Sequence, residues 1–175
     1  AMYHAKQEGR NYLQFSTVGM NIRARERLTL KSELRRALSN NEFVLHFQPR
    51  VDLESQAIIG CEALIRWEHP ERGLVGPGEF IPPIEENGLI VPIGQWVLEE
   101  VCRTIVQWDA ELGDRKSPEV HVNISPDQFR QPNFAGTVMA TLDHFGVDPK
   151  RIALEVTETT AMTDADQSLA QSRAL

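Results

Sequence analysis

Three oxygen-bearing side chains occur singly in three apolar segments of the sequence. Glu62 lies in IIGCEALIRW, Asn123 lies in VHVNIS, and Glu155 lies in RIALEVTE. A carboxylate in an apolar segment is costly unless it is paired or binds a cation. Two carboxylates and a carboxamide oxygen are hard ligands of the kind that Mg²⁺ or Mn²⁺ prefers. These residue types therefore predict a divalent-cation site, provided that the fold brings the three segments together.

Each of the three residues also has a purely structural explanation. Glu62 could be a surface carboxylate on a half-exposed strand, and Asn123 could be a satisfied amide in the core. Glu155 could be the ion-pair partner of a Lys or Arg. One such coincidence is common, but three on successive strands favour the metal site.

The segment 58–67 is predicted to be a strand because its side chains alternate in character with period two. Glu62 and Arg66 share one face of this strand, together with Gly60 and Leu64. The opposite face is apolar and carries Cys61, Ala63, Ile65 and Trp67. One face is therefore expected to pack against helices, while the other presents a carboxylate and a guanidinium.

Three further strands are predicted, at 43–49, 120–125 and 151–158, and Gln48 lies near the end of the first. The polar connection between 43–49 and 58–67 is too short for a parallel crossover, so these two strands should form an antiparallel hairpin. Within 120–125 and 151–158, the polar residues Asn123 and Glu155 face away from the apolar positions.

Amphipathic helices are predicted at 28–38 and 92–112, and after Ser125–Pro126 as one helix that ends at Gly146. The segment 68–87 is rich in Pro and Gly and is expected to be a long functional loop, with Phe80 packed down. Strands separated by long helices predict an α/β fold with a parallel sheet, in which successive strands are neighbours. Ligands in such folds bind at the C-terminal ends of strands, and each oxygen-bearing residue is expected in the C-terminal half of its strand.

Composition excludes several classes of function. The chain has 18 Lys and Arg against 25 Asp and Glu, with a net charge of -7 and a pI of about 5.3, so nucleic-acid binding is not expected. Cys61 and Cys102 lack metal-ligand spacing and suit reduced thiols in a cytoplasmic protein. No apolar run is long enough to cross a bilayer, although a parent protein could be anchored through a region outside this chain.

Five motifs together resemble the EAL-domain family of cyclic di-GMP phosphodiesterases. They are FQP at 47–49, CEALIRW at 61–67, FIPPIEENGLI at 80–90, VNIS at 122–125 and LEVTE at 154–158. Their order and spacing fit that family over residues 28–175. The resemblance implies a TIM-like (β/α)8 barrel with an antiparallel first strand, of which only the N-terminal part is present in this chain.

The resemblance also assigns roles to residues. It implies that Gln48 and Arg66 contact the bound dinucleotide, and the forked guanidinium of Arg66 suits a phosphate group. Glu158 would support one of the metal ligands. The implied metal ligands are Glu62, Asn123 and Glu155, of which Glu62 and Glu155 are also the implied catalytic residues.

The function implied by the resemblance is metal-dependent hydrolysis of cyclic di-GMP to linear pGpG in bacterial second-messenger signalling, with two Mg²⁺ or Mn²⁺ ions in the complete domain. A catalytically inactive cyclic di-GMP receptor, or an interaction module, remains the alternative. The Asp-Asp pair, the Lys and the later Glu and Gln of the family follow the fourth strand and lie beyond this sequence. These 175 residues alone are therefore expected to lack part of the active site.

The domain organisation predicted from these resemblances has three parts. Residues 1–20 resemble the C-terminal tail of a GGDEF (diguanylate cyclase) domain, because AMYHAK and GRN match the pattern in which such domains end. Residues 21–38 would be a linker and leading helix, and residues 39–175 a C-terminally truncated EAL domain. Expected partners are cyclic di-GMP and an upstream GGDEF domain in the same polypeptide, and homodimer formation stays open.

Overall fold

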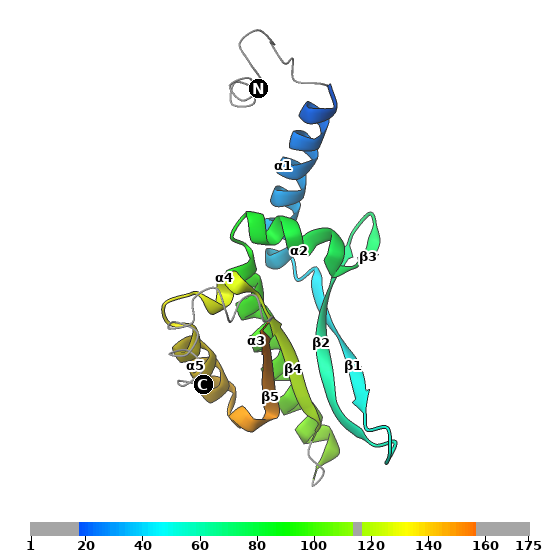
Figure 1. Cartoon of the computed structure of the whole chain (residues 1–175), viewed down its shortest axis with the longest axis vertical. Helices are drawn as coiled ribbons and strands as arrows, with labels where there is room; N and C mark the ends of the chain where they lie inside the picture. Colours follow the sequence, from blue (N-terminus) through cyan, green and yellow to red (C-terminus); the bar gives the residue numbers. More distant parts are fainter. Residues whose placement is uncertain (1–17, 114–116, 157–175) are drawn as a thin grey trace, which may run out of the picture.

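The computed structural model describes residues 18–113 and 117–156, with side chains described from Thr29 onward. Along the long axis, α1 extends away from the sheet and the β1–β2 hairpin points toward the opposite end (Figure 1). The elements in chain order are α1 (Val18–Ser39), β1 (Phe43–Val51), β2 (Ile58–His69), β3 (Gly73–Val75), α2 (Pro77–Glu86), α3 (Ile90–Leu112), β4 (Glu119–Ile124), α4 (Pro126–Phe129), α5 (Phe134–Phe145), a 3₁₀ turn (Pro149–Arg151) and β5 (Ile152–Val156).

The described residues form one five-stranded sheet with the order β1-β2-β4-β5, and β3 pairs with β2. β1 and β2 are antiparallel, whereas β2–β4 and β4–β5 are parallel. The predicted hairpin and the predicted order of neighbouring strands are therefore confirmed. One antiparallel strand ahead of the parallel ones is the arrangement expected for the N-terminal part of a TIM-like barrel.

The main core lies between one face of the sheet and the helices α3 and α5. The predicted apolar face of β2 contributes Cys61 and Ala63, which are 4% and 5% exposed. Val120 and Val122 of β4 are buried beside them. Because side chains alternate along each strand, burial of this face turns Glu62, Asn123 and their neighbours toward the opposite face.

A second core joins α1 and α2 to the end of β2. Leu34 and Ala37 of α1 are fully buried with Trp67 and Phe80, in a cluster that also includes Phe43. The predicted helix at 28–38 is thus confirmed, but it starts ten residues earlier than predicted, at Val18. This cluster fixes α1 against the end of the strand that carries Glu62.

The prediction of a long loop at 68–87 is wrong. β2 continues to His69, β3 follows, and α2 occupies Pro77–Glu86. Pro77 occupies the first turn of α2, where its missing N–H costs nothing, although Pro82 and Pro83 lie inside the helix. Phe80 and Ile84 are fully buried, and this burial offsets the backbone hydrogen bonds that the internal prolines remove.

The helix predicted between Pro126 and Gly146 is interrupted. α4 begins at Pro126 with a capping box formed by Ser125 and Gln128, and it ends at Phe129. α5 then runs from Phe134 and ends at Gly146, which has a left-handed φ of 68°. Pro132 lies in the break, where its ring and missing donor disfavour a continuous helix.

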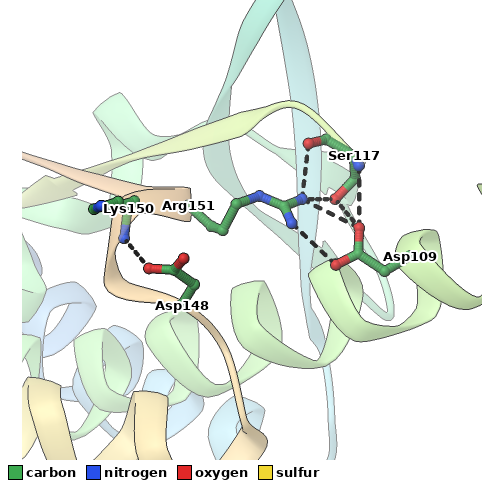
Figure 2. Close-up of polar contacts among 5 residues, drawn as sticks. All are labelled: Asp109, Ser117, Asp148, Lys150 and Arg151. Carbon is green, nitrogen blue, oxygen red and sulfur yellow. Dashed lines mark hydrogen bonds and ion pairs between the residues drawn. The ribbon is translucent and has the colours of Figure 1, made fainter. Parts of the chain in front are cut away.

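A polar cluster ties the end of α3 to the starts of β4 and β5 (Figure 2). Arg151 donates to Asp109 Oδ2 at 3.0 Å and to the carbonyl oxygen of Ser117 at 2.7 Å. The backbone N–H of Ser117 donates to Asp109 Oδ1 at 3.0 Å. Three separate elements are therefore joined at the N-terminal end of the parallel strands.

Among the described residues, no helix is both long and apolar enough to cross a membrane.

Candidate active site

The polar face of the sheet gathers the predicted site residues through strand register. Gln48 of β1 pairs with Glu62 of β2, and Glu62 pairs in turn with His121 of β4. Asn123 of β4 pairs with Glu155 of β5. Side chains at paired positions project from the same face, so these five residues form a contiguous polar surface on four strands.

Glu62 and Asn123 are in direct contact. Asn123 Nδ2 donates a hydrogen bond of 2.6 Å to Glu62 Oε1, between two strands that lie side by side. Asn123 is exposed, so the structural alternative of an amide satisfied within the core is wrong. A short hydrogen bond to a carboxylate fixes both side chains on the polar face.

Glu155 has basic neighbours. His121 Nδ1 lies 2.8 Å from Glu155 Oε1, and Arg50 Nη1 lies 3.8 Å from the same oxygen. The structural alternative for Glu155, an ion pair with a basic residue, is therefore present in this structure. The side chain of Glu155 is nevertheless 46% exposed, so the pair leaves it open to solvent.

One expectation about position within the strands is wrong. Asn123 and Glu155 lie near the C-terminal ends of β4 and β5, as predicted, but Glu62 is the fifth residue of the 12 in β2. The last residues of β2, from Trp67 to His69, pair with β3 instead of β4. The part of β2 that pairs with β4 ends at Ala63, so Glu62 still lies at the C-terminal end of that pairing.

The two predicted substrate-binding residues lie on the same face of the sheet but at different positions along the strands. Gln48 is exposed directly beside Glu62. Arg66 lies four residues beyond Glu62, half-buried, and its Nη1 donates to the carbonyl oxygen of Ile65 at 2.9 Å. Within the described part of the chain, Arg66 has no carboxylate partner, so its charge is available to a ligand.

A pocket of about 320 Å³ opens next to Asn123 and Glu155. Its wall is mainly apolar, and Ser125 and Glu85 add polar groups. The helix residues that line it come from α2, α3 and α4, and include Ile81, Ile90, Ile93, Val97 and Gln128. A ligand bound at the polar face of β4 and β5 would thus have a partly apolar recess beside it.

A comparison with protein families identifies the family to which this chain belongs. The family model described as the EAL domain matches residues 31–175, most of the chain. The chain belongs to the EAL domain family.

Named relatives agree with this assignment. The bifunctional diguanylate cyclase/cyclic di-GMP phosphodiesterase MucR of Pseudomonas aeruginosa is 46% identical over 169 residues, which cover 97% of this chain and 24% of MucR. The cyclic di-GMP phosphodiesterase PdeR of Escherichia coli is 37% identical over 170 residues, covering 97% of this chain and 25% of PdeR. The chain therefore spans about a quarter of the length of these two relatives.

Solved EAL structures share the fold. The PaMucR phosphodiesterase in complex with c-di-GMP has a TM-score of 0.78 and 42% identity, covering 83% of this chain and 59% of that one. The FimX EAL domain of Xanthomonas citri in complex with c-diGMP has a TM-score of 0.76 and 25% identity, covering 88% and 58%. The chain thus corresponds to part of a TIM-like EAL barrel.

The EAL residues present fit a hard divalent cation in donor chemistry. Glu62 and Glu155 offer carboxylate oxygens, and Asn123 lies between them, bonded to the first and in register with the second. Among the described residues, no group of three His, Cys, Asp or Glu side chains is close enough to hold a metal ion. A donor set on this face therefore has to include the carboxamide oxygen of Asn123 together with the carboxylates of Glu62 and Glu155.

Arg50 and His121 were not predicted as site residues from the sequence, although both lie close to Glu155 in the structure. For His121 the sequence holds a usable signal, because it lies two residues before Asn123 in the same strand and therefore on the same face. Arg50 gave no signal, because its approach to Glu155 depends on register across three strands. Glu158 lies outside the described residues.

Burial raises the pKa of the Cys61 thiol, which disfavours a thiolate nucleophile beside Glu62.

Proposed function

We propose that the protein carrying this EAL domain hydrolyses one phosphodiester bond of cyclic di-GMP to give linear pGpG, with Mg²⁺ or Mn²⁺ as cofactor. The observation that supports this most is the contact of Glu62 with Asn123, which is itself in register with Glu155 on the next strand. Membership of the EAL family, whose relatives include cyclic di-GMP phosphodiesterases, supports the choice of substrate.

In this proposal, Glu62, Asn123 and Glu155 hold the metal. Two carboxylates and a carboxamide provide the charge and the hard oxygen donors that such ions require. A bound divalent ion supplies an activated water and neutralises phosphate charge. Glu62 and Glu155 are the catalytic carboxylates, and Glu158 is proposed to support a ligand.

Gln48 and Arg66 are proposed to bind the substrate. The protein is acidic, with a net charge of -7, so a dianionic ligand needs local positive charge. Arg66 lies on the same face as Glu62 and is not neutralised by a described carboxylate. Gln48 lies beside Glu62 and can donate or accept at a ligand held there.

The reaction is balanced by one water molecule. The water oxygen forms a bond to one phosphorus, and the bond from that phosphorus to the 3′ oxygen breaks. The product keeps a 5′ phosphate, and the released 3′ oxygen takes up a proton. The ring is thereby opened once, which gives pGpG.

The direct test is to incubate the intact protein with cyclic di-GMP and Mn²⁺ and to separate the nucleotides by chromatography. The proposal predicts pGpG, and no pGpG when EDTA replaces Mn²⁺. Binding of cyclic di-GMP without any product would instead identify the protein as a receptor. If the protein neither binds cyclic di-GMP nor forms product, an interaction module is the function that remains.

The context of the domain is part of the same proposal. We place it in the cytoplasm, downstream of a GGDEF domain in one polypeptide. Support comes from the resemblance of residues 1–20 to a GGDEF tail and from the match to a bifunctional relative.

A further inference from the structure

Two basic side chains, His121 and Arg50, lie close to one carboxylate oxygen of Glu155. His121 Nδ1 lies 2.8 Å from Glu155 Oε1, and Arg50 Nη1 lies 3.8 Å from it. Arg50 Nη1 also packs against the edge of the His121 ring, in contact with both ring nitrogens. His121 lies on β4, Glu155 on β5 and Arg50 on β1. Arg50 therefore comes from a strand that is separated from β4 by β2.

Gly60 explains how Arg50 reaches β4 across the intervening strand β2. Arg50 pairs with Gly60, and Gly60 pairs with Glu119. A Cβ at position 60 would lie 3.1 Å from the carbonyl oxygen of Glu119 and 3.7 Å from the ring of His121. The missing side chain therefore leaves an opening over β2 through which Arg50 and His121 meet.

The ring of His121 is itself held in place. Its side chain is only 15% exposed, and Nε2 lies 3.0 Å from Glu119 Oε1 while Nδ1 faces Glu155. A ring held at both nitrogens presents Nδ1 to Glu155 in one orientation. In the described part of the chain, Glu155 Oε2 has no hydrogen-bond partner, so this second oxygen is available to an ion.

We propose that His121, assisted by Arg50, positions the carboxylate of Glu155 so that its free oxygen faces the metal. This inference rests on the proposed role of Glu155 as a metal ligand. A long carboxylate side chain that is 46% exposed has several rotamers, and a partner that fixes one oxygen selects among them. Partners that orient metal ligands change metal affinity by about 10–100-fold when removed.

The test measures Mn²⁺ affinity of the intact protein from the electron paramagnetic resonance signal of free Mn²⁺, without substrate. His121→Ala is expected to weaken Mn²⁺ binding about 10-fold or more, and Arg50→Ala to weaken it by a smaller factor. His121→Asn keeps an N–H close to the position of Nδ1 and is expected to recover most of the affinity. Turnover by His121→Ala should return when Mn²⁺ is raised, with KM for cyclic di-GMP unchanged.

Two controls match these changes in residue type. His144→Ala and Arg103→Ala alter exposed helix residues that contact Phe145 and Glu100, and both should bind Mn²⁺ like the wild type. Thermal unfolding of each variant separates loss of the site from loss of the fold.

The outcomes distinguish this proposal from the proposed function. Normal Mn²⁺ affinity in Glu155→Ala would overturn the ligand role of Glu155 itself. If Glu155→Ala loses affinity while His121→Ala and Arg50→Ala keep it within twofold, only the positioning role is overturned. Equal losses of Mn²⁺ affinity in His121→Ala and His121→Asn would also overturn the positioning role. An N–H donor near the position of Nδ1 would then have no effect on metal binding.

Discussion

Arg66 combines an uncompensated charge with a position on the polar face of the sheet. It lies four residues beyond Glu62 on β2, which corresponds to about 13 Å along an extended strand. Its Nη1 is occupied by the carbonyl oxygen of Ile65, which orients the guanidinium without neutralising it. Arg66 should therefore act on the ligand and have little effect on the metal.

Arg66→Ala is predicted to weaken cyclic di-GMP binding by about 1.5–3 kcal/mol, because a charge-assisted hydrogen bond to phosphate is lost. Arg66→Lys should restore only part of this loss, since an ammonium group cannot form the forked contact. Calorimetric titration of the intact protein measures both. Arg103→Ala, on α3, is the matched control, and unchanged affinity in Arg66→Ala would contradict the assignment.

The types of the site residues could be predicted from the sequence, but their partners could not. Glu62 and Asn123 were recognisable because polar side chains in apolar strands need a reason to be there. The hydrogen bond between them, and the approach of Arg50 and His121 to Glu155, depend on register between distant strands. Register is set by packing across the whole sheet, which local periodicity does not contain.

At the level of elements, one ion pair ties the C-terminal end of α3 to the starts of β4 and β5, beside the apolar core that they share. Arg151 is 14% exposed and donates to both carboxylate oxygens of Asp109, at 3.0 and 3.2 Å. The same guanidinium binds the Ser117 carbonyl oxygen, just before β4 (Figure 2). Hydrogen bonding from Arg151 lowers the pKa of Asp109 to about 2.

Asp109→Asn is predicted to destabilise the domain by about 1–2 kcal/mol at pH 7, after allowance for the exposure of Asp109. Because the folded-state pKa is depressed, this stabilisation is complete above about pH 4, the ordinary range of a carboxyl group, and is lost as the pH falls toward 2. Urea unfolding at pH 7 and pH 3 measures the gap between variant and wild type, which should narrow at pH 3.

The control for this change is Glu111→Gln on the same helix. Glu111 is exposed and accepts a hydrogen bond from Gln107 of its own helix, so removing its charge should shift the urea midpoint little. Equal midpoints for Asp109→Asn and Glu111→Gln would contradict the role of the ion pair.

The strands and long helices were predictable because each carries its period over many residues. α2 was missed because prolines dominate its sequence, and proline usually ends a helix. What holds α2 in place is the full burial of Phe80 and Ile84 against α1 and β2, a tertiary effect that local preferences do not include. The break between α4 and α5 does have a local signal in the sequence, Pro132.

At the scale of the whole molecule, the sheet of the described residues has an open edge. β5 pairs with β4 on one side and with no other described strand. A barrel removes such edges by closing on itself, and related EAL structures are longer than this chain. Ile152, Leu154 and Val156 are only partly buried along this edge.

These 175 residues, purified alone, are therefore predicted not to hydrolyse cyclic di-GMP. Glu62, Asn123 and Glu155 can hold one ion, whereas two-metal hydrolysis needs ligands shared by ions about 3.5–4 Å apart. Incubation with cyclic di-GMP and Mn²⁺, followed by chromatography, gives the answer. Turnover that disappears in the Glu155→Ala variant of the same fragment would show this prediction to be wrong.

The measurement that tests the account most directly is turnover of cyclic di-GMP by the intact protein with Glu62→Ala. Removing this carboxylate removes both charge and geometry from the metal site, so the account predicts loss of pGpG formation and weaker Mn²⁺ binding. Glu54→Ala, in the exposed turn of the β1–β2 hairpin, is the control and should keep wild-type activity. Wild-type turnover by Glu62→Ala would contradict the central claim that Glu62, Asn123 and Glu155 form the catalytic metal site.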